Sequence, residues 1–390
     1  MSRTPLPSPP AKTASAETRE LVRRAGLRHA SDETPGLTRE PLKPLRDGEI
    51  PKANAFRYRD AMGRLVRDAD ALARIRHLAI PPAWQQVWIS ADADGHLQAT
   101  GRDARGRKQY RYHAAWQAGR GETKFDAMRQ FGQVLPRIRR RVEAELSSSQ
   151  NKLTHDRVLA ALVRLLDTTW LRIGNVEYAR SNRSYGFSTL RRKHVGAQGN
   201  GLRLAFKGKS GVQHEARITD RRVVRLVRRC QELPGQALFQ YVDDDGSAHK
   251  IDSADVNDWL ADAAGTRITA KDFRTWHGSV LALELTLAAC VEGADPCKPT
   301  DVLRSVAKRL GNTPAVCKKA YIHPQVLTLS AGLGDDAMRS AARAAPWAVQ
   351  AAPKRGLMAA ERRLLAMLGG SKRKRGAAGL AVSEAAAAGV

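Results

Sequence analysis

The hydrophobic period changes near residue 120, and this change constrains the fold more than any other feature of the sequence. From about 50 to 118, short alternating segments such as 87–89 and 96–100 are separated by turn residues such as those at 92–95. This pattern predicts a small antiparallel sheet. Beyond 120, apolar residues recur at helical spacing, as over 158–166, where Thr154 provides an N-cap. The sequence therefore predicts an α+β chain, with a strand-rich domain followed by a mainly helical one.

A single hairpin is predicted inside the helical part. Residues 202–206 alternate toward the turn 208–211, and residues 212–216 alternate away from it. The two ends of the chain lack periodicity. We therefore expect four regions: a disordered basic tail over 1–30, a strand-rich N-terminal domain over 31–118, a mainly helical domain with a short hairpin sheet over 119–345, and a flexible Ala-rich basic tail over 346–390.

The charge balance points to a polyanionic partner. There are 66 Lys and Arg residues against 39 Asp and Glu, so the net charge is 66 − 39 = +27. Nucleic acid is the leading candidate, with binding that weakens as salt rises. A non-catalytic architectural protein would have the same charge. The charge therefore predicts a partner but not a reaction.

Several other classes of site are not predicted. The four cysteines, at positions 230, 290, 297 and 317, form no CxxC pair, which argues against a zinc site or a disulfide framework. The acidic segment 92–97 has Leu97 where an EF-hand loop needs glycine, and 243–246 is typical of a turn. No Walker A motif, signal peptide or apolar run of roughly 18 residues occurs. We expect a cytoplasmic protein without a membrane span, metal or cofactor.

The segment from 301 to 321 predicts two helices joined by a sharp turn. The first helix should stop at Gly311, and Thr313 and Pro314 provide the N-cap and first position of the second. Asn312 then lies in the link, and Tyr321 about two turns into the second helix. From its position alone, Tyr321 is a half-buried packing residue.

The stretch from Thr313-Pro314 to Tyr321 resembles the nucleophile motif of type IB DNA topoisomerases, in particular their poxvirus-like and bacterial branch. The resemblance runs from roughly 50 to 330. Three further motifs follow the family's order: Leu171-Arg172-Ile173-Gly174-Asn175, Phe206-Lys207-Gly208-Lys209 and Lys271-Asp272-Phe273-Arg274-Thr275. The resemblance implies that Tyr321 is the nucleophile, that Arg172 and Arg274 clamp the phosphate, and that Lys209 protonates the leaving 5′ oxygen.

Asn312 departs from the family's commonest pattern, which has histidine nine residues before the tyrosine. An asparagine amide donates a hydrogen bond but has no charge to share. We expect Asn312 to be a donor to a phosphate oxygen and to take no part in acid–base chemistry.

The resemblance also implies residues that contact DNA. Gly106-Arg107-Lys108-Gln109-Tyr110-Arg111-Tyr112-His113 resembles the family's Gly-Arg-Arg-Gln-Tyr-x-Tyr segment. Strand alternation should place Tyr110 and Tyr112 on one face and Arg111 on the other. The implied DNA contacts are Gln109, Tyr110, Tyr112, Tyr178 and Lys271. The strand-rich domain would then be one half of a DNA clamp, and the helical domain would be catalytic.

A tyrosine recombinase is the main alternative, because it shares this catalytic fold, the cationic set and the phosphotyrosine chemistry. Recombinases usually have His-x-x-Arg where this chain has Lys271 to Arg274, and their N-terminal domain is helical. These differences favour the topoisomerase. The resemblance implies a monomer that relaxes supercoiled duplex DNA through a 3′-phosphotyrosyl intermediate, without ATP or metal, at the bacterial nucleoid.

Overall fold

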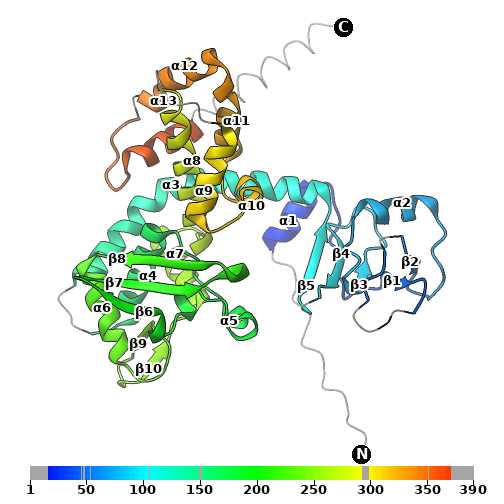
Figure 1. Ribbon diagram of the computed structural model, residues 1–390, viewed down its shortest axis with the longest axis horizontal. Coiled ribbons are helices and arrows are strands. Elements are labelled where there is room, and N and C mark those ends of the chain that lie inside the picture. Colours follow the sequence, from blue (N-terminus) through cyan, green and yellow to red (C-terminus); the bar gives the residue numbers. More distant parts are fainter. Residues whose placement is uncertain are drawn as a thin grey trace, which may run out of the picture. The chain divides into compact units, whose positions relative to one another are not determined.

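The computed structural model describes residues 16–44, 46, 49–52, 54–104, 106–148, 152–291, 298–349 and 351–369 (Figure 1). The chain divides into two compact units, residues 1–124 and 125–390. The helix α3 (Ala114–Ser147) begins in the first unit and continues in the second. The predicted boundary between 118 and 119 lies six residues before this division, and both fall inside α3, where no loop marks the end of a unit.

The first unit contains the predicted antiparallel sheet. Its five strands have the order β2-β1-β3-β4-β5, and every pair is antiparallel. They are β1 (Leu37–Pro41), β2 (Phe56–Arg59), β3 (Gln85–Ile89), β4 (Leu97–Arg102) and β5 (Lys108–Tyr112). Helix α2 (Ala69–His77) starts at Asp68, whose carboxylate accepts from the Ala71 amide, and it buries Ile75 against Val87 and Ile89 of the sheet.

The predicted tail over 1–30 is wrong for the part that the structure describes. Residues Ala16–Arg24 form helix α1. Val22 and Leu27 are buried against Trp116 of α3. Arg28 forms ion pairs with Asp92 and Asp94, so the acidic turn before β4 is neutralised by an arginine. Val22 and Leu27 alone do not form a helical hydrophobic pattern that the sequence would reveal. Their burial depends on Trp116, almost ninety residues later in the chain. Residues 1–15 lie outside the described part.

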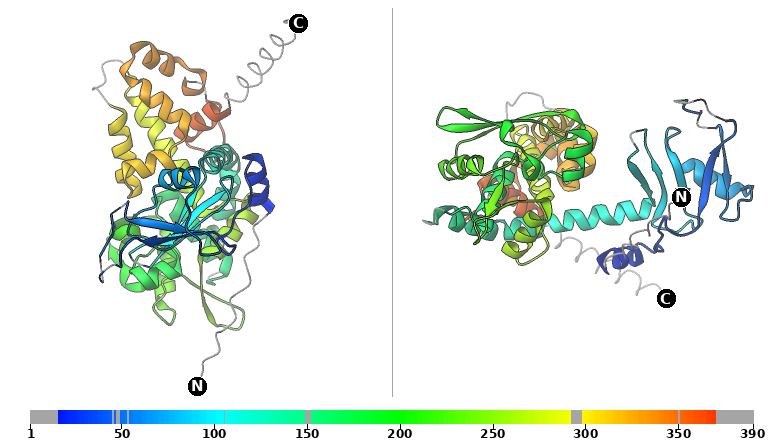
Figure 2. Two further views of the ribbon diagram at one scale, coloured as in Figure 1. Left: turned by 90° about the vertical axis from the view of Figure 1, so that its right-hand side faces the viewer. Right: turned by 90° about the horizontal axis from the view of Figure 1, so that it is seen from below.

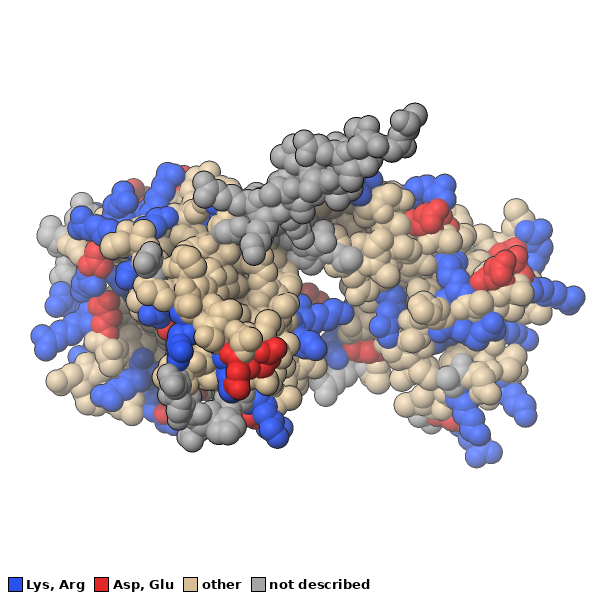
Figure 3. Space-filling view, turned by 90° about the horizontal axis from the view of Figure 1, so that it is seen from above, with Lys and Arg blue, Asp and Glu red and all other residues tan. Residues whose placement is uncertain are grey.

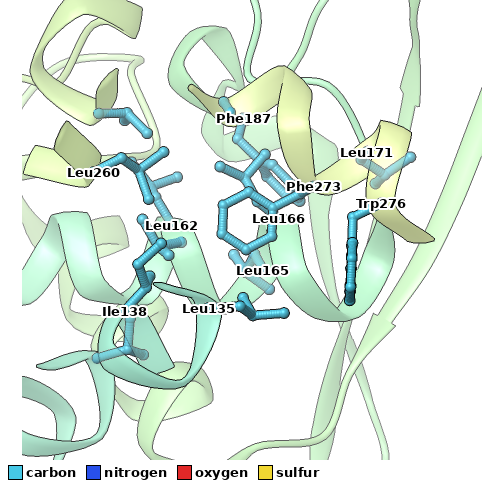
Figure 4. Packing of buried hydrophobic residues seen from close by; sticks show 14 of the residues in the cluster. Leu135, Ile138, Leu162, Leu165, Leu166, Leu171, Phe187, Leu260, Phe273 and Trp276 are labelled. Atoms are coloured by element: carbon cyan, nitrogen blue, oxygen red, sulfur yellow. The ribbon is translucent and has the colours of Figure 1, made fainter. Parts of the chain in front are cut away.

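The second unit is mainly helical, as predicted, and is built around one large core. Its helices are α4 (His155–Thr169), α5 (Val176–Asn182), α6 (Arg221–Glu232), α7 (Ser253–Ala264), α8 (Ala270–Ala288), α9 (Pro299–Leu310), α10 (Pro314–Ala320), α11 (Pro324–Ala331), α12 (Asp336–Ala344) and α13 (Pro346–Val349). Leu162, Leu165 and Leu166 of α4 pack between α3, α7 and α8 (Figure 4). These residues are fully or almost fully buried, so α4 is the central helix of the unit.

Two small sheets lie in the second unit. The first has the order β6-β7-β8, formed by β6 (Val195–Gln198), β7 (Gly201–Lys207) and β8 (Gln213–Ile218). Strands β7 and β8 make the predicted hairpin, with Phe206 opposite His214 and the 3-10 turn Lys209–Gly211 at its tip. The second sheet pairs β9 (Gln240–Val242) with β10 (Ala248–Lys250) across the predicted acidic turn. In Figures 1 and 2, α11 and α12 lie on one side of α8 and α9, away from the β6–β8 sheet.

The predicted flexible tail over 346–390 is also wrong for its described part. Residues 359–369 are helical. Leu357, Leu364 and Leu368 are buried in the main core, and Glu361 is fully buried. This segment has an amphipathic pattern, but the surrounding alanines and basic residues resemble a low-complexity tail. Residues 370–390 lie outside the described part.

No helix within the described residues has the length and apolarity needed to cross a membrane. The described residues also contain no group of three or more His, Cys, Asp or Glu side chains placed to hold a metal ion.

Candidate active site

Arg172 is held on a short extended segment that follows α4. Helix α4 ends at Trp170, which has a left-handed backbone with φ of 63°. The amide of Phe187 donates to the Arg172 carbonyl at 3.0 Å. Gly174 has φ of 106°, and a Cβ at Gly186 would lie only 2.5 Å from the Gly174 nitrogen. The glycine of the Arg-x-Gly motif is therefore required by a left-handed turn packed tightly against a second glycine.

Arg274 lies on α8 and is only 2% exposed. Its Nη2 donates to the Leu310 carbonyl at 2.7 Å, and its Nη1 donates to the Trp170 carbonyl. Its Cζ lies 5.1 Å from the ring centre of Tyr321. Burial, with a further contribution from the charge of Arg172, lowers the pKa of Arg274 to about 10. The guanidinium is still charged at neutral pH, and two backbone carbonyls fix its orientation.

Asn312 lies in the predicted link, after Gly311 ends α9 with φ of 60°. Its Oδ1 accepts a hydrogen bond from Nη2 of Arg172. Because Oδ1 faces Arg172, Nδ2 on the other side of the amide makes no hydrogen bond with that guanidinium. Asn312 therefore has one atom engaged with Arg172 and one donor left to use.

Three buried N–H groups beside Tyr321 have no hydrogen-bond partner within the described part of the chain. They belong to Arg172 Nη1, Arg274 Nε and Asn312 Nδ2. A buried donor without a partner costs about 1–3 kcal/mol, and more when it is charged. Three such donors in one cluster are explained by a bound anion with several acceptor oxygens. A phosphate has this chemistry, and the two guanidinium groups match its geometry.

The predicted position of Tyr321 inside the second helix is wrong, because the residue follows directly after α10. It is the C-cap of that helix and is 9% exposed. Ser279 of α8 donates to the Tyr321 carbonyl at 3.1 Å and accepts from the His323 amide at 2.9 Å. The backbone directly after the tyrosine is therefore anchored to α8.

The charges around Tyr321 favour its phenolate. Burial alone would raise the pKa of Tyr321, but the charges of Arg274 and Arg172, a hydrogen bond from Arg274 and the charge of Lys271 together hold it below its usual value. A lower pKa is what an oxygen nucleophile needs near neutral pH.

Lys209 is placed apart from this cluster. It lies at the exposed tip of the β7–β8 hairpin, on a turn in which Ser210 has a left-handed backbone. The structure therefore brings together Tyr321, Arg172, Arg274 and Asn312, and leaves Lys209 on an adjoining hairpin.

Two family models match the chain. The catalytic core of eukaryotic DNA topoisomerase I matches residues 113–332, which is more than half of the chain, and the N-terminal domain of bacterial DNA topoisomerase IB matches residues 55–103. The chain belongs to the type IB DNA topoisomerases. The alternative family, the tyrosine recombinases, receives no support from these matches.

Viral type IB topoisomerases are among its similar relatives. DNA topoisomerase 1B of Acanthamoeba polyphaga mimivirus is 32% identical over 269 residues, which cover 66% of this chain and 79% of the viral protein. DNA topoisomerase 1B of vaccinia virus (strain Copenhagen) is 23% identical over 299 residues, covering 73% and 88%. DNA topoisomerase 1 of rabbit fibroma virus (strain Kasza) is 22% identical over 297 residues, covering 70% and 88%.

Three of the residues predicted to contact DNA lie in the first unit of this type IB topoisomerase. Tyr110 and Tyr112 stack on one face of β5 with ring centres 6.0 Å apart, and Arg111 on the other face donates to the Ala79 carbonyl at 2.8 Å. Tyr110 is about half exposed. The amide of Gln109 already donates to Asp103 at 2.8 Å. The predicted alternation is present, and the role of these residues stays a prediction.

The other two lie in the second unit. Tyr178 of α5 is about half exposed, and Lys271 in the first turn of α8 is exposed. Lys271 is near enough to Tyr321 to help lower the pKa of its phenol. It therefore belongs to the surroundings of Tyr321 as well as to the predicted DNA contacts.

Four residues that shape the site of this topoisomerase were not predicted from the sequence. Ser279 anchors the Tyr321 backbone, and a Cβ on Gly278 would lie 3.1 Å from the Tyr321 carbonyl oxygen. Trp170 accepts from Arg274 and stacks on His277 at 5.1 Å. The fourth is His214 of β8. The one local signal was Gly278, because an interior helix glycine costs about 1 kcal/mol and calls for a packing reason.

Proposed function

We propose that this protein relaxes supercoiled duplex DNA by cutting and resealing one strand through a phosphotyrosine formed on Tyr321. The observation that carries the proposal is the set of three partnerless buried donors on Arg172, Arg274 and Asn312 beside that tyrosine. Such donors are arranged before substrate arrives and stabilise the charge that develops on a phosphate during substitution.

The reaction would be a pair of mirrored substitutions at phosphorus. The Tyr321 phenol loses its proton to solvent water and attacks the phosphate as the phenolate, an O–P bond forms, and the bond from phosphorus to the 5′ oxygen breaks. Arg172, Arg274 and Asn312 hold the non-bridging oxygens, and Lys209 gives its proton to the departing 5′ oxygen. The products are a 3′-phosphotyrosyl strand and a free 5′-hydroxyl. After strand rotation the 5′-hydroxyl attacks the phosphotyrosine, and Lys209 recovers the proton.

Neither ATP nor a metal ion is required in this proposal. The phosphotyrosyl bond retains the free energy of the phosphodiester, so resealing needs no further source. Charge neutralisation that a metal would supply in other phosphoryl-transfer enzymes is assigned to the two arginines.

Duplex DNA is the proposed partner of a monomer at the bacterial nucleoid. The net charge of +27 supports binding to a polyanion. Lys and Arg side chains are spread over the visible face of each unit in Figure 3, with fewer Asp and Glu side chains among them. In this proposal the first unit contributes Gln109, Tyr110 and Tyr112 to a clamp, and the second contributes Tyr178 and Lys271.

The deciding experiment is relaxation of positively and negatively supercoiled plasmids in EDTA without ATP. We expect complete relaxation by the wild type and none by Tyr321→Phe, which keeps the ring but lacks the attacking oxygen. Denatured reaction mixtures should contain protein joined to the 3′ end of the cut strand. Relaxation by Tyr321→Phe, or protein joined to the 5′ end, would contradict the proposal.

A further inference from the structure

His214 lies at the root of the hairpin that carries Lys209. It is on the inner, partly buried face of β8, while its neighbours Gln213 and Glu215 are exposed. Its cross-strand partner is Phe206, and the two ring centres are 5.6 Å apart. Since Phe206 is buried in the main core, one side of the histidine ring rests on a fixed surface.

The same ring touches the backbone of two turns. A Cβ on Gly208 would lie 2.4 Å from Cδ2 of His214, and a Cβ on Gly311 would lie 2.4 Å from its Cε1. Gly208 directly precedes Lys209, and Gly311 directly precedes Asn312. The imidazole therefore lies between the hairpin turn and the turn that carries a phosphate donor.

The imidazole is neutral under ordinary conditions. Burial, followed by the charges of Arg172 and Arg274, lowers the pKa of His214 to about 4. A neutral ring can pack against glycine backbone without adding a third positive charge to the arginine pair. The contribution of His214 is therefore the packing of its neutral ring against Gly208 and Gly311.

The hairpin tip needs such a support. Residues 209–211 are all exposed, so no packing of their own side chains fixes the direction of Lys209. We propose that His214 is a positioning residue, which holds the Lys209 hairpin against the Gly311 turn so that Lys209 meets the same phosphate as Asn312. This inference rests on the proposed function and adds a residue that acts on the reaction through Lys209.

The first test compares cleavage rates with DNA affinity. Single-turnover cleavage of a short duplex that releases its 5′ strand would be measured for the wild type, His214→Ala and His214→Phe. We expect His214→Ala to cleave about 10 to 100 times more slowly, since a displaced catalytic group costs up to about that factor. Its affinity for DNA should change less than about twofold, because many phosphate contacts are retained. His214→Phe should recover most of the rate, and a rate as low as that of His214→Ala would overturn the proposal in favour of chemistry at the ring nitrogens.

The second test uses Gly208→Ala. Gly208 has φ of −95°, which alanine adopts readily, so the cost of this change comes from the clash with the His214 ring. We expect slower cleavage in the wild-type background and no additional loss in the His214→Ala background. Independent, multiplied losses would show that the ring and the hairpin root do not act together. Gly196→Ala on β6 is the matched control, because no atom lies within 4 Å of the added Cβ.

The third test uses a substrate that does not require Lys209 as a proton donor. A substrate with sulfur in place of the bridging 5′ oxygen has a leaving group that needs no proton, since a thiol is far more acidic than an alcohol. His214→Ala should then cleave at close to the wild-type rate. A defect that persists on this substrate means that His214 does not act through Lys209. A wild-type protein that cleaves neither substrate would instead remove the proposed function, so the two failures are distinguishable.

Discussion

At the scale of single residues, Asn312 differs most from the family's common pattern. Its Oδ1 accepts from Arg172, and its Nδ2 is one of the three partnerless donors. Removing one such donor typically costs about 100-fold or more in rate. We expect Asn312→Ala to slow single-turnover cleavage by about that factor, whereas Asn312→His should retain activity, because imidazole also donates.

Asn312→Asp is the matched control for that prediction. It keeps the size of the side chain and the acceptor for Arg172, but it replaces the donor by a negative charge facing the phosphate. It should be slower than Asn312→Ala. An alanine variant that cleaves at the wild-type rate would remove Asn312 from the site.

The pH dependence of cleavage belongs to the same scale. Because the pKa of Tyr321 is held below its usual value, the rate should rise with pH and level off below the ordinary tyrosine pKa of about 10. Lys271→Gln removes one of the charges that lower this pKa, so the rising limb should move to higher pH.

The measurement is single-turnover cleavage at saturating protein between pH 5 and 10. Lys250→Gln, an exposed lysine on β10, serves as the control and should leave the limb in place. A limb that stays still or moves to lower pH in Lys271→Gln would show that Lys271 does not act on the nucleophile.

The residues of the site that could be predicted are those within short motifs. Arg172, Arg274, Asn312 and Tyr321 are each recognisable from their immediate neighbours in the sequence. His214 is different, because its role depends on a contact with Gly311, almost a hundred residues later in the chain. No local pattern distinguishes it from an ordinary inward-facing strand residue.

At the scale of elements, the link between α10 and α11 is fixed from outside by α8. Ser279 is fully buried and bonds to the backbone of both Tyr321 and His323. Ser279→Ala would remove the two hydrogen bonds that the hydroxyl makes with the Tyr321 carbonyl and the His323 amide, which costs about 1–3 kcal/mol. We expect a lower free energy of unfolding by urea and slower cleavage.

Ser305→Ala is a suitable control, since Ser305 is an exposed residue of α9. It should change neither quantity measurably. If Ser279→Ala lowers stability but cleaves at the wild-type rate, Ser279 supports the fold alone and does not position Tyr321.

Helix ends were predicted correctly where the sequence has residues with a clear capping preference. Helix α9 ends at Gly311 and α10 begins after Thr313, as predicted. Helix α10 nevertheless ends one residue before Tyr321, because Pro324 starts α11 and the intervening backbone bonds to Ser279. Contacts with another helix decided that boundary, and they are not visible in the local sequence.

At the scale of the whole molecule, the C-terminal segment is part of the core of the second unit. Glu361 accepts two bonds from Arg139, at 2.7 and 2.8 Å, and Arg139 also binds both oxygens of Asp167. Asp167 lies 2.9 Å from Nε2 of His277. The ring of His277 in turn stacks on Trp170, whose carbonyl orients Arg274. A continuous set of contacts therefore joins residues after 350 to Arg274 of the candidate active site.

This arrangement explains why the two tails were mispredicted while the fold class was not. The α+β class depends on periodicity over many residues, which the sequence shows directly. Whether a short amphipathic segment such as 359–369 docks depends on a buried acceptor for Arg139, and that requirement exists only once α3 and α4 have packed. Low-complexity composition around the segment concealed it.

Glu361→Ala tests the role of this network. The change leaves Arg139 with a partly uncompensated charge in the core, and removing one partner of a buried ion pair costs about 3–5 kcal/mol. We expect a loss of that size in the free energy of unfolding of the second unit, measured by urea denaturation. Glu215→Ala breaks an exposed pair with Arg203 and should cost less than about 1 kcal/mol. Single-turnover cleavage is measured on the same variants. If Glu361→Gln, which keeps the shape and one of the two acceptor oxygens, restores stability but cleaves more slowly than the wild type, the charge itself acts through Asp167 and His277 on Arg274. If it restores both, the segment after 350 supports the site only by completing the core.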